Sequence, residues 1–449
     1  MSNQKFISAS EFCDLVTDGT HDSPKKTETG IKLVTSKNIV GGSLDLTSAY
    51  FISELDARNI NKRSQVHIND VLLSMIGTVG EVALIEKEPD FVIKNVGLLK
   101  NSDPKKAKWL YYYLKSPITQ NLIKDRLRGT TQQYIPLGEL RNLPILKPNS
   151  EEHLQNTIDQ LSSLDKKIQL NTQINQTLEQ IAQALFKSWF VDFDPVRAKV
   201  QALSDGLSLE QAELAAMQTI SGKTPEELAA LSQAQPNRYA ELAETAKAFP
   251  CEMVEVDGVE VPKGWEIGTF TDITESRREK VKNDKATVLS AVSSGELVKS
   301  EEYFTKQVFS KNIDKYLKVY QWDFAYNPAR INIGSIGLHE ADYLGAVSPV
   351  YEVFSVSDKY HWFLKRILNL ETTKIKIQSL CTGSVRQTLK LKDFQSIDCV
   401  IPDEKTLSIF NKKWEEYRTL ILENNENTQT LSEIRDLLLP RLLSGDFND

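Results

Sequence analysis

The sequence lacks the patterns on which metal sites, disulfide scaffolds and membrane spans depend. It has only four cysteines in 449 residues, none spaced as CxxC, and its five histidines form no HExxH motif. Free thiols in a reducing cytoplasm are therefore the simplest interpretation. No apolar run reaches the length needed to span a bilayer, and the residues after Met1 lack the apolar stretch of a signal peptide. We expect a cytoplasmic protein without membrane contact.

Fingerprints of bound nucleotides and cofactors are also missing. Ser221-Gly-Lys-Thr224 resembles the end of a phosphate-binding loop, but Met217 stands where the first glycine belongs and no strand precedes it. The segment Asn-Pro-Ala-Arg from Asn327 lacks the second proline and the aromatic residue of the flipped-base motif of amino-methyltransferases. No glycine-rich dinucleotide fingerprint follows a first strand. We therefore predict no catalytic residues, no metal site and no cofactor of the chain's own.

A long helical run between Glu151 and Phe193 is the clearest positive signal. Neither Gly nor Pro occurs between Glu151 and Val191, so we expect one helix of about 40 residues, roughly 60 Å long. Its apolar side chains follow the alternating four- and three-residue steps of a coiled coil, so it needs a partner helix. A similar run from Leu407 to Leu442 supplies that partner. The seam residues expected to pair these helices or to dock partner subunits are Ile168, Asn171, Leu178, Ile181, Leu185 and Trp189, with Ile421, Asn424, Leu431, Ile434 and Leu438.

The second run repeats the first, which indicates an internal duplication. Asn424 follows Asn171 by 253 residues, and the segment from Gly383 repeats the order of small, Gln and Leu residues of the segment from Gly129 at a spacing of 254. The alternative is two unrelated domains that each end in an amphipathic helix. If the chain is duplicated, the two helices run antiparallel and a pseudo-two-fold relates the domains. The seam asparagines would either set the helix register or lie at a wet edge of the pair.

These patterns together predict an α+β protein. We expect a mixed α/β domain at residues 1–150, a spacer helix at 151–195, a second mixed domain at 261–400 and a second spacer helix at 401–449. Between the first helix and the second domain, residues 196–260 form an Ala- and Glu-rich helical insert and linker. The capping boxes that begin at Ser208 and Thr224 favour short helices there. This insert is better interpreted as a spacer or docking element than as a site.

The charge distribution favours contact of the two domains with a polyanion. The net charge is −7, but residues 1–150 carry 20 Lys and Arg against 16 Asp and Glu, and residues 261–400 carry 20 against 17. The acidic excess lies in the predicted helices and the insert. A nucleic acid would therefore be met by the two domains and not by the helices.

Each domain has a set of polar residues suited to DNA. Arg and Gln contact base edges in bidentate fashion, Thr and Asn contact bases or phosphates, and Gly lets the backbone approach closely. The alternative is an ordinary polar surface loop. The candidate DNA-binding residues are Arg126, Arg128, Thr130, Thr131, Gln132, Gln133 and Tyr134 in the first domain, and Arg330, Asn332, Ser384, Arg386 and Gln387 in the second.

The order of these segments resembles the specificity subunit of type I restriction–modification systems over nearly the whole chain. The segments that carry the resemblance are Asp18 to Pro24, Val261 to Trp265, Tyr326 to Gly337, Leu178 to Pro195 and Leu431 to Phe447. In that family, target-recognition domains alternate with spacer helices. The insert at residues 196–250 departs from the minimal plan of the family, and its role is left open.

The resemblance implies a non-catalytic reader of double-stranded DNA. Each domain would bind one half of a bipartite, asymmetric site, and the helix pair would fix the separation of the halves at about one helical turn of DNA. The outward helix faces would dock two methyltransferase subunits, which bring S-adenosylmethionine, while restriction–translocase subunits bring ATP and Mg²⁺. The alternatives are a two-headed coiled-coil scaffold that binds no DNA and an enzyme, for which no complete site is present.

Overall fold

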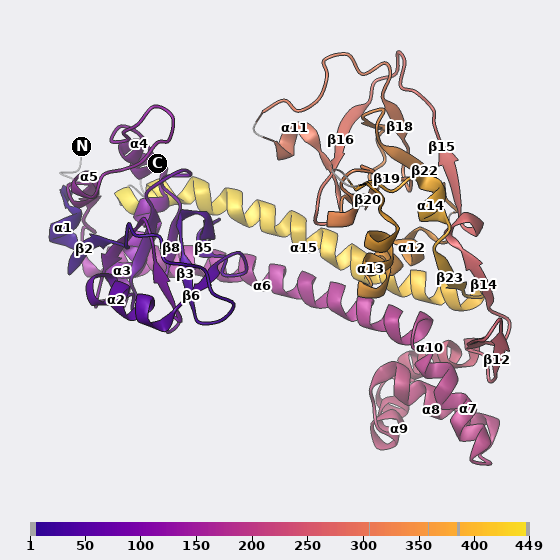
Figure 1. Ribbon diagram of the computed structural model, residues 1–449. Coiled ribbons are helices and arrows are strands. Elements are labelled where there is room, and N and C mark those ends of the chain that lie inside the picture. Colours follow the sequence, from indigo (N-terminus) through magenta and orange to yellow (C-terminus); the bar gives the residue numbers. More distant parts are fainter. Residues whose placement is uncertain (1–5, 305, 358, 384–386, 446–449) are drawn as a thin grey trace. The chain divides into compact units, whose positions relative to one another are not determined.

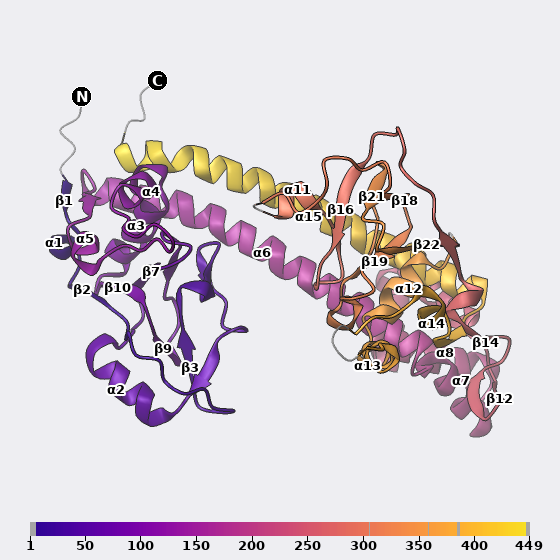
Figure 2. The ribbon, with the colours of Figure 1, turned by 45° about the horizontal axis from the view of Figure 1, so that its top comes forward.

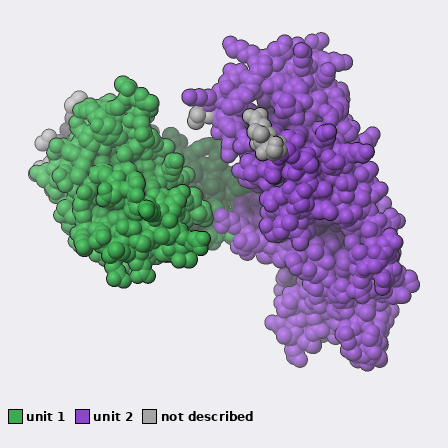
Figure 3. Space-filling model, in the orientation of Figure 1, with its two compact units in different colours: residues 1–174, 422–449 green, residues 175–421 purple. Residues whose placement is uncertain are grey.

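The computed structural model describes residues 6–304, 306–357, 359–383 and 387–445. The chain forms two compact units, which we call unit 1 (residues 1–174 and 422–449) and unit 2 (residues 175–421; Figure 3). Both boundaries fall within long helices, α6 (Glu151–Phe190) and α15 (Glu404–Ser444), so each unit contains part of both helices.

Unit 1 consists of short strands and short helices that precede α6. Its strands are β1 (Phe6–Ser8), β2 (Leu15–Asp18), β3 (Ile31–Val34), β4 (Ile39–Val40), β5 (Ser43–Leu44), β6 (Tyr50–Ile52), β7 (Val71–Ser74), β8 (Val82–Leu84), β9 (Phe91–Ile93), β10 (Val96–Lys100) and β11 (Pro144–Leu146). Its shorter helices are α1 (Ala9–Phe12), α2 (Glu54–Ser64), α3 (Pro104–Lys115), α4 (Pro117–Lys124) and α5 (Leu137–Arg141).

An antiparallel sheet of order β2-β10-β7-β8 forms the centre of unit 1. A second sheet, β6-β3-β9, contains the parallel pair β3 and β9, and β1 pairs with β11. Helix α3 begins with Pro104 at its first turn, where the Asp103 side chain accepts backbone hydrogen bonds. It buries Trp109, whose Nε1 donates to the Leu146 carbonyl at 2.7 Å. This contact fixes α3 to the strand that leads into α6.

Unit 2 begins with a helical insert and continues with a second mixed domain. Its strands are β12 (Met253–Val256), β13 (Val259–Pro262), β14 (Glu266–Thr269), β15 (Thr274–Arg277), β16 (Thr287–Ala291), β17 (Leu297–Lys299), β18 (Leu317–Val319), β19 (Phe324–Tyr326), β20 (Ile336–Leu338), β21 (Gly345–Val347), β22 (Glu352–Val356) and β23 (Asp398–Ile401). Its helices besides α6 and α15 are α7 (Asp194–Ser204), α8 (Leu209–Ser221), α9 (Pro225–Ala234), α10 (Pro236–Ala248), α11 (Ser300–Tyr303), α12 (His361–Leu368), α13 (Glu371–Leu380) and α14 (Leu391–Gln395).

The strand topology of unit 1 recurs in unit 2. The sheet β15-β22-β19-β20 repeats the order of β2-β10-β7-β8, the parallel pair β16 and β21 repeats β3 and β9, and the antiparallel pair β14 and β23 repeats β1 and β11. Strand β18, which pairs with β21, is an addition of unit 2. The α+β class predicted from the sequence is confirmed, and the shared topology is that expected of an internal duplication.

Within unit 1, α6 and α15 lie side by side and run antiparallel (Figures 1 and 2). His153 Nε2 near the start of α6 is 2.6 Å from the carbonyl of Leu442 near the end of α15. Further along α6, Asn171 Nδ2 lies 3.3 Å from Thr428 Oγ1. Residue numbers therefore rise along one helix as they fall along the other.

The same pairing continues within unit 2. Asn175 donates from Nδ2 to the Ile421 carbonyl at 3.3 Å, and the rings of Phe186 and Phe410 lie 5.6 Å apart. Asn171 and Asn175 are half-buried, and both hydrogen-bond across the pair. The asparagines therefore link the helices at a polar stretch flanked by apolar contacts.

Two predicted seam residues lie outside the seam. The side chains of Ile181 and Ile434 are each 40% exposed, whereas Ala182 and Leu439, one and five positions further on, are 1% and 3% exposed. The buried positions keep a seven-residue spacing, through Leu161, Ala182 and Trp189 on α6 and through Leu407, Trp414 and Leu442 on α15. Ile181 and Ile434 each stand one position before a step of that series, so they face the side of the pair. Trp189, a predicted seam residue near the end of α6, is 1% exposed, so the predicted seam continues to that end.

The insert is a cluster of helices that follows α6 and packs Val196 and Phe249 into the main core of unit 2. Helix α6 ends at Phe190, before the predicted residue 195, because Phe193 adopts a left-handed φ of 58° and Pro195 occupies the first turn of α7. The capping boxes predicted at Ser208 and Thr224 are present at the starts of α8 and α9. Lys199 is 1% exposed and donates to two carbonyls at the end of α10. The β12–β13 hairpin crosses the predicted domain boundary at residue 260.

Candidate nucleic-acid interface

A tight loop in unit 1 carries most of the first domain's candidate DNA contacts. Arg128 and Tyr134 close it by exchanging backbone hydrogen bonds of 2.8 and 2.9 Å. Gly129 has a φ of +87°, and a Cβ at this position would lie 2.5 Å from the Gln132 carbonyl oxygen. Only glycine fits this turn without strain. The four residues between Gly129 and Tyr134 are exposed at its tip. We call residues 128–134 loop 1.

Loop 1 is held against the central sheet of unit 1. Ile135, which is 1% exposed, donates its backbone N–H to the Met75 carbonyl at 3.0 Å, immediately after β7. The Gly77 N–H donates to the Gln133 carbonyl at 3.2 Å. The loop therefore has a fixed base beneath a polar tip, which is the arrangement needed to present side chains to a ligand.

The predicted contact residues of the first domain have different environments. Arg126 donates to the Leu122 carbonyl at 2.8 Å and folds back onto α4, and Arg128 pairs with Glu139 at 2.9 Å. The Tyr134 side chain is 42% exposed. The candidates at the tip of loop 1, which are all exposed, are Thr130, Thr131, Gln132 and Gln133.

Unit 2 contains the equivalent loop. Thr382 and Thr388 exchange backbone hydrogen bonds of 2.9 and 2.8 Å, at positions 254 residues after Arg128 and Tyr134. Leu389 donates to the Pro328 carbonyl at 3.1 Å, as Ile135 does to Met75. We call residues 382–388 loop 2.

The second domain's candidates gather beside loop 2. Asn332 Nδ2 lies 3.3 Å from Gln387 Oε1, and Gln378 Nε2 donates to the Asn332 carbonyl at 3.2 Å. Arg330 is exposed on the turn after β19. The remaining candidates, Ser384 and Arg386, lie outside the described residues.

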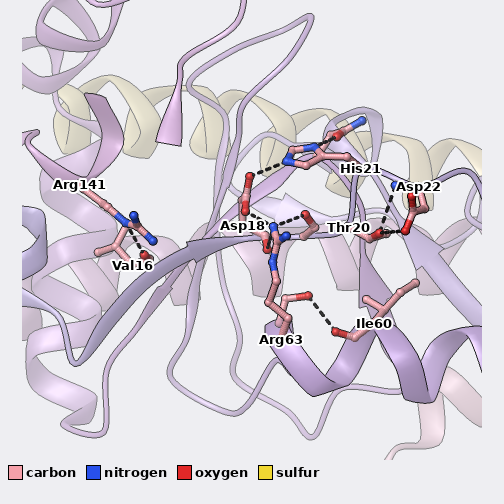
Figure 4. A network of polar contacts seen from close by, with 11 residues as sticks. Val16, Asp18, Thr20, His21, Asp22, Ile60, Arg63 and Arg141 are labelled. Carbon is pink, nitrogen blue, oxygen red and sulfur yellow. Dashed lines mark hydrogen bonds and ion pairs between the residues drawn. The ribbon is translucent and has the colours of Figure 1, made fainter. Parts of the chain in front are cut away.

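A polar cluster beside loop 1 was not selected from the sequence. Figure 4 shows the Asp18 carboxylate between His21 and Arg63. Asp18 is 3% exposed; Arg63 pairs with its Oδ1, and His21 Nε2 lies 3.1 Å from its Oδ2. The other His21 nitrogen, Nδ1, lies 2.7 Å from Asn95 Oδ1. The segment Asp18 to Pro24 carried part of the family resemblance. That resemblance is the signal by which the sequence could have indicated this cluster.

The cluster borders a cavity of about 640 Å³ in unit 1. Met75, Ile76 and Ile135 contribute apolar wall, and Tyr134 connects the cavity to loop 1. On the opposite side, Arg141 donates from Nε to the Val16 carbonyl at 3.0 Å (Figure 4). Polar groups of several elements therefore converge on a partly apolar hollow.

A buried aspartate precedes the first strand of the β7–β8 hairpin in unit 1 and of the β19–β20 hairpin in unit 2. In unit 1, Asp70 accepts from the His67 N–H at 2.8 Å and pairs with Lys100. In unit 2, Asp323 accepts from the Tyr320 N–H at 2.9 Å and pairs with Arg277. Burial raises the pKa of Asp323 to about 6, although Tyr320 and Arg277 both oppose that shift.

The described residues include neither a metal cluster nor a membrane-spanning helix. No group of three or more His, Cys, Asp and Glu side chains is placed to hold a metal ion there. None of the helices in that part of the chain has the length and apolar character needed to cross a bilayer.

Comparison with known proteins decides the family. Residues 1–180 match the type I restriction modification DNA specificity domain. The chain is 43% identical over 352 residues to the type I restriction enzyme HindI specificity subunit of Haemophilus influenzae. The match covers 73% of this chain and 73% of the relative. The chain belongs to the specificity subunits of type I restriction–modification systems.

Two further specificity subunits match at lower identity. The MjaIX specificity subunit of Methanocaldococcus jannaschii is 23% identical over 84% of this chain and 77% of its own length. The crystal structure of a type I S subunit from M. genitalium covers 98% of this chain and 97% of its own, with 15% identity and a TM-score of 0.48. The specificity-subunit family is the non-catalytic, DNA-recognising component of these systems.

Proposed function

We propose that this specificity subunit reads a bipartite, asymmetric site in double-stranded DNA, with loop 1 and its neighbours at one half-site and loop 2 and its neighbours at the other. The observation that carries this proposal is the repeated loop. Loops 1 and 2 are closed by the same backbone bridge and anchored to the same strand position. Their tips differ in sequence, Thr-Thr-Gln-Gln against Ser-Val-Arg-Gln. A shared backbone frame with different side chains reads different bases.

The helix pair supplies the surface for other subunits. Leu170, Ile174, Leu422 and Leu437 of unit 1 and Leu420 of unit 2 are apolar side chains exposed on α6 or α15, and Leu437 is 74% exposed. Exposed apolar side chains concentrated on a helix pair are typical of protein interfaces. We assign the docking of two methyltransferase subunits to these faces together with Ile181 and Ile434, with restriction–translocase subunits joining that complex.

The chemistry belongs to those partners. In this proposal the specificity subunit supplies position and sequence selection, the methyltransferase subunits hold S-adenosylmethionine, and the translocase–nuclease subunits hold ATP and Mg²⁺. The helices α6 and α15 set the length of the unread spacer, because a continuous helix of 40 residues is a stiff element. The complex would act in the cytoplasm, on the host's own DNA and on incoming DNA.

The proposal is tested by mapping methylated adenines. The subunit is expressed with its methyltransferase partners, and the modified motif is sequenced for the native protein and for two variants. One variant replaces residues 130–133 by alanine, and the other replaces Asn332 and Gln387 by alanine. Each variant should relax or abolish recognition of one half-site and leave the other half-site unchanged. Identical motifs from all three proteins would refute the assignment of the loops.

Binding separates DNA recognition from a scaffold role. The assembled complex should bind duplex DNA with an affinity that falls steeply as salt concentration rises, since phosphate contacts release counterions. An assembled complex that binds no duplex at low salt would leave the two-headed scaffold as the function.

A further inference from the structure

The cavity beside loop 1 has the features of a binding pocket and not of a packing gap. Its volume of about 640 Å³ lies within the range of small-molecule sites. Ile76 and Ile135 belong to its apolar lining, and Asp18 and Asn95 belong to its polar lining. Tyr134, 42% exposed, belongs both to the cavity lining and to loop 1. A molecule bound by loop 1 could therefore extend into the cavity.

The charges at the cavity favour a ligand that carries phosphate. Arg63 and Arg141 contribute two guanidinium groups, whereas Asp18 contributes one buried carboxylate. Arg63 compensates Asp18 and remains 56% exposed on its side chain. Arg141 uses Nε for the Val16 carbonyl, which leaves its two terminal nitrogens for an incoming anion. The remaining charge at the cavity is therefore positive.

A nucleotide extruded from a duplex matches these features together. A base has two flat faces that stack on aromatic and apolar side chains, a polar edge that seeks hydrogen bonds, and a phosphate on either side. The cavity offers Tyr134 and an apolar wall for the faces, Asn95 and Thr17 for the edge, and Arg141 for the phosphate. The exposed tip of loop 1 adjoins the cavity through Tyr134, so DNA held by the loop would reach it.

We propose that unit 1 captures one unstacked DNA base in this cavity during recognition of its half-site. The inference rests on the proposed function, since loop 1 must first bring the duplex to the cavity. The captured base is distinct from the adenine that the methyltransferase subunits modify. Its role is selection: a base that unstacks with difficulty, or whose edge does not match the cavity, weakens binding at that position.

Fluorescence of 2-aminopurine tests this inference directly. The base is placed singly at each position of the half-site read by unit 1, except the methylated adenine, and its emission rises when it leaves the stack. Binding to the methyltransferase complex should raise the emission several-fold at one position. Fluorescence anisotropy of an end-labelled duplex reports binding in the same samples. Binding without an emission rise at any position would overturn the base-capture proposal alone, whereas absence of binding would overturn the proposed function.

Variants show whether the signal comes from this cavity. Leu137→Trp fills the cavity and should abolish the emission rise, while Leu55→Trp, at a side chain 70% exposed on α2, serves as the control. Tyr134→Ala should lose the rise and Tyr134→Phe should retain it, because stacking needs the ring and not the hydroxyl group. A rise that persists in Leu137→Trp would place the extruded base elsewhere and refute the proposal.

Discussion

Arg366 of α12 and Glu179 of α6 form an ion pair with Nη1 and Oε2 2.7 Å apart, although the Arg366 side chain is 2% exposed and that of Glu179 is 45% exposed. The Arg366 guanidinium also lies 3.8 Å from the ring centre of Trp414 on α15. One buried cation therefore joins α12 to both long helices within unit 2.

The unequal burial of this pair predicts unequal effects of mutation. Glu179→Ala leaves a buried cation without its anion and should lower the free energy of unfolding of unit 2 by about 2–3 kcal/mol. Arg366→Met keeps the packing and leaves a carboxylate that water reaches, so its effect should stay within about 1 kcal/mol. Urea unfolding of both variants measures the difference. The reverse order, with Arg366→Met the more damaging, would contradict this account of the pair.

Glu340 should make the stability of unit 2 depend on pH. Burial by itself raises the pKa of Glu340, but Lys365 and Arg418 outweigh it and hold the pKa below its ordinary 4.5. A lowered pKa stabilises the fold above the unfolded pKa, and this contribution is lost as the pH falls through the folded value. Glu340→Gln should therefore be less stable than the native protein at pH 7 by about 1–3 kcal/mol.

The difference between Glu340→Gln and the native protein should shrink as the pH falls below the ordinary value of 4.5. Urea unfolding at pH 7 and at pH 4 measures it. Glu301→Gln, at an exposed position, provides the control and should change stability little at either pH. A Glu340→Gln deficit of equal size at both pH values would show that the ionised carboxylate is not its source.

Gly129 should be required for the shape of loop 1. Gly129→Ala forces a positive φ on a residue with a Cβ and brings that Cβ to 2.5 Å from a backbone oxygen, which costs about 1–3 kcal/mol of local strain. We expect weaker DNA binding and relaxed selectivity at the half-site of unit 1 only. Gly138→Ala is the matched control, because a Cβ there meets nothing within 4 Å. Methylation mapping of both variants distinguishes them, and equal behaviour would remove the role assigned to the turn.

Helix length should set the unread spacer. Seven residues added to α6 after Ile168, with seven added to α15 after Thr428, preserve the pairing and lengthen each helix by about 10 Å, or about three base pairs of DNA. Mapping of methylated adenines should show both half-sites unchanged and a longer spacer between them. An unchanged spacer in an active complex would refute the proposal that the helices set its length.

Loops 1 and 2 are the part of the candidate site that short sequence patterns predicted. The polar tips, the glycines and the 254-residue repeat were visible as short patterns, so both loops were identified. The polar cluster was missed because Asp18 and Arg63 are 45 residues apart, and Asn95 is 74 residues from His21. No local periodicity records such contacts, and the cavity that they border exists only when the strands are assembled.

The sequence by itself determined the long helices, their pairing, the α+β class and the duplicated plan, because each follows from apolar periodicity and from repeats that act over a few turns or strands. Only the tertiary structure decided which seam positions are buried, since Ile181 and Ile434 lie one position beside the buried series and stay 40% exposed. It also decided that Arg126 and Arg128 are engaged by the protein itself while Thr130 to Gln133 are free to face a ligand. The reason is that burial and pairing depend on which neighbours the folded chain brings to each side chain, and a short sequence pattern does not record them.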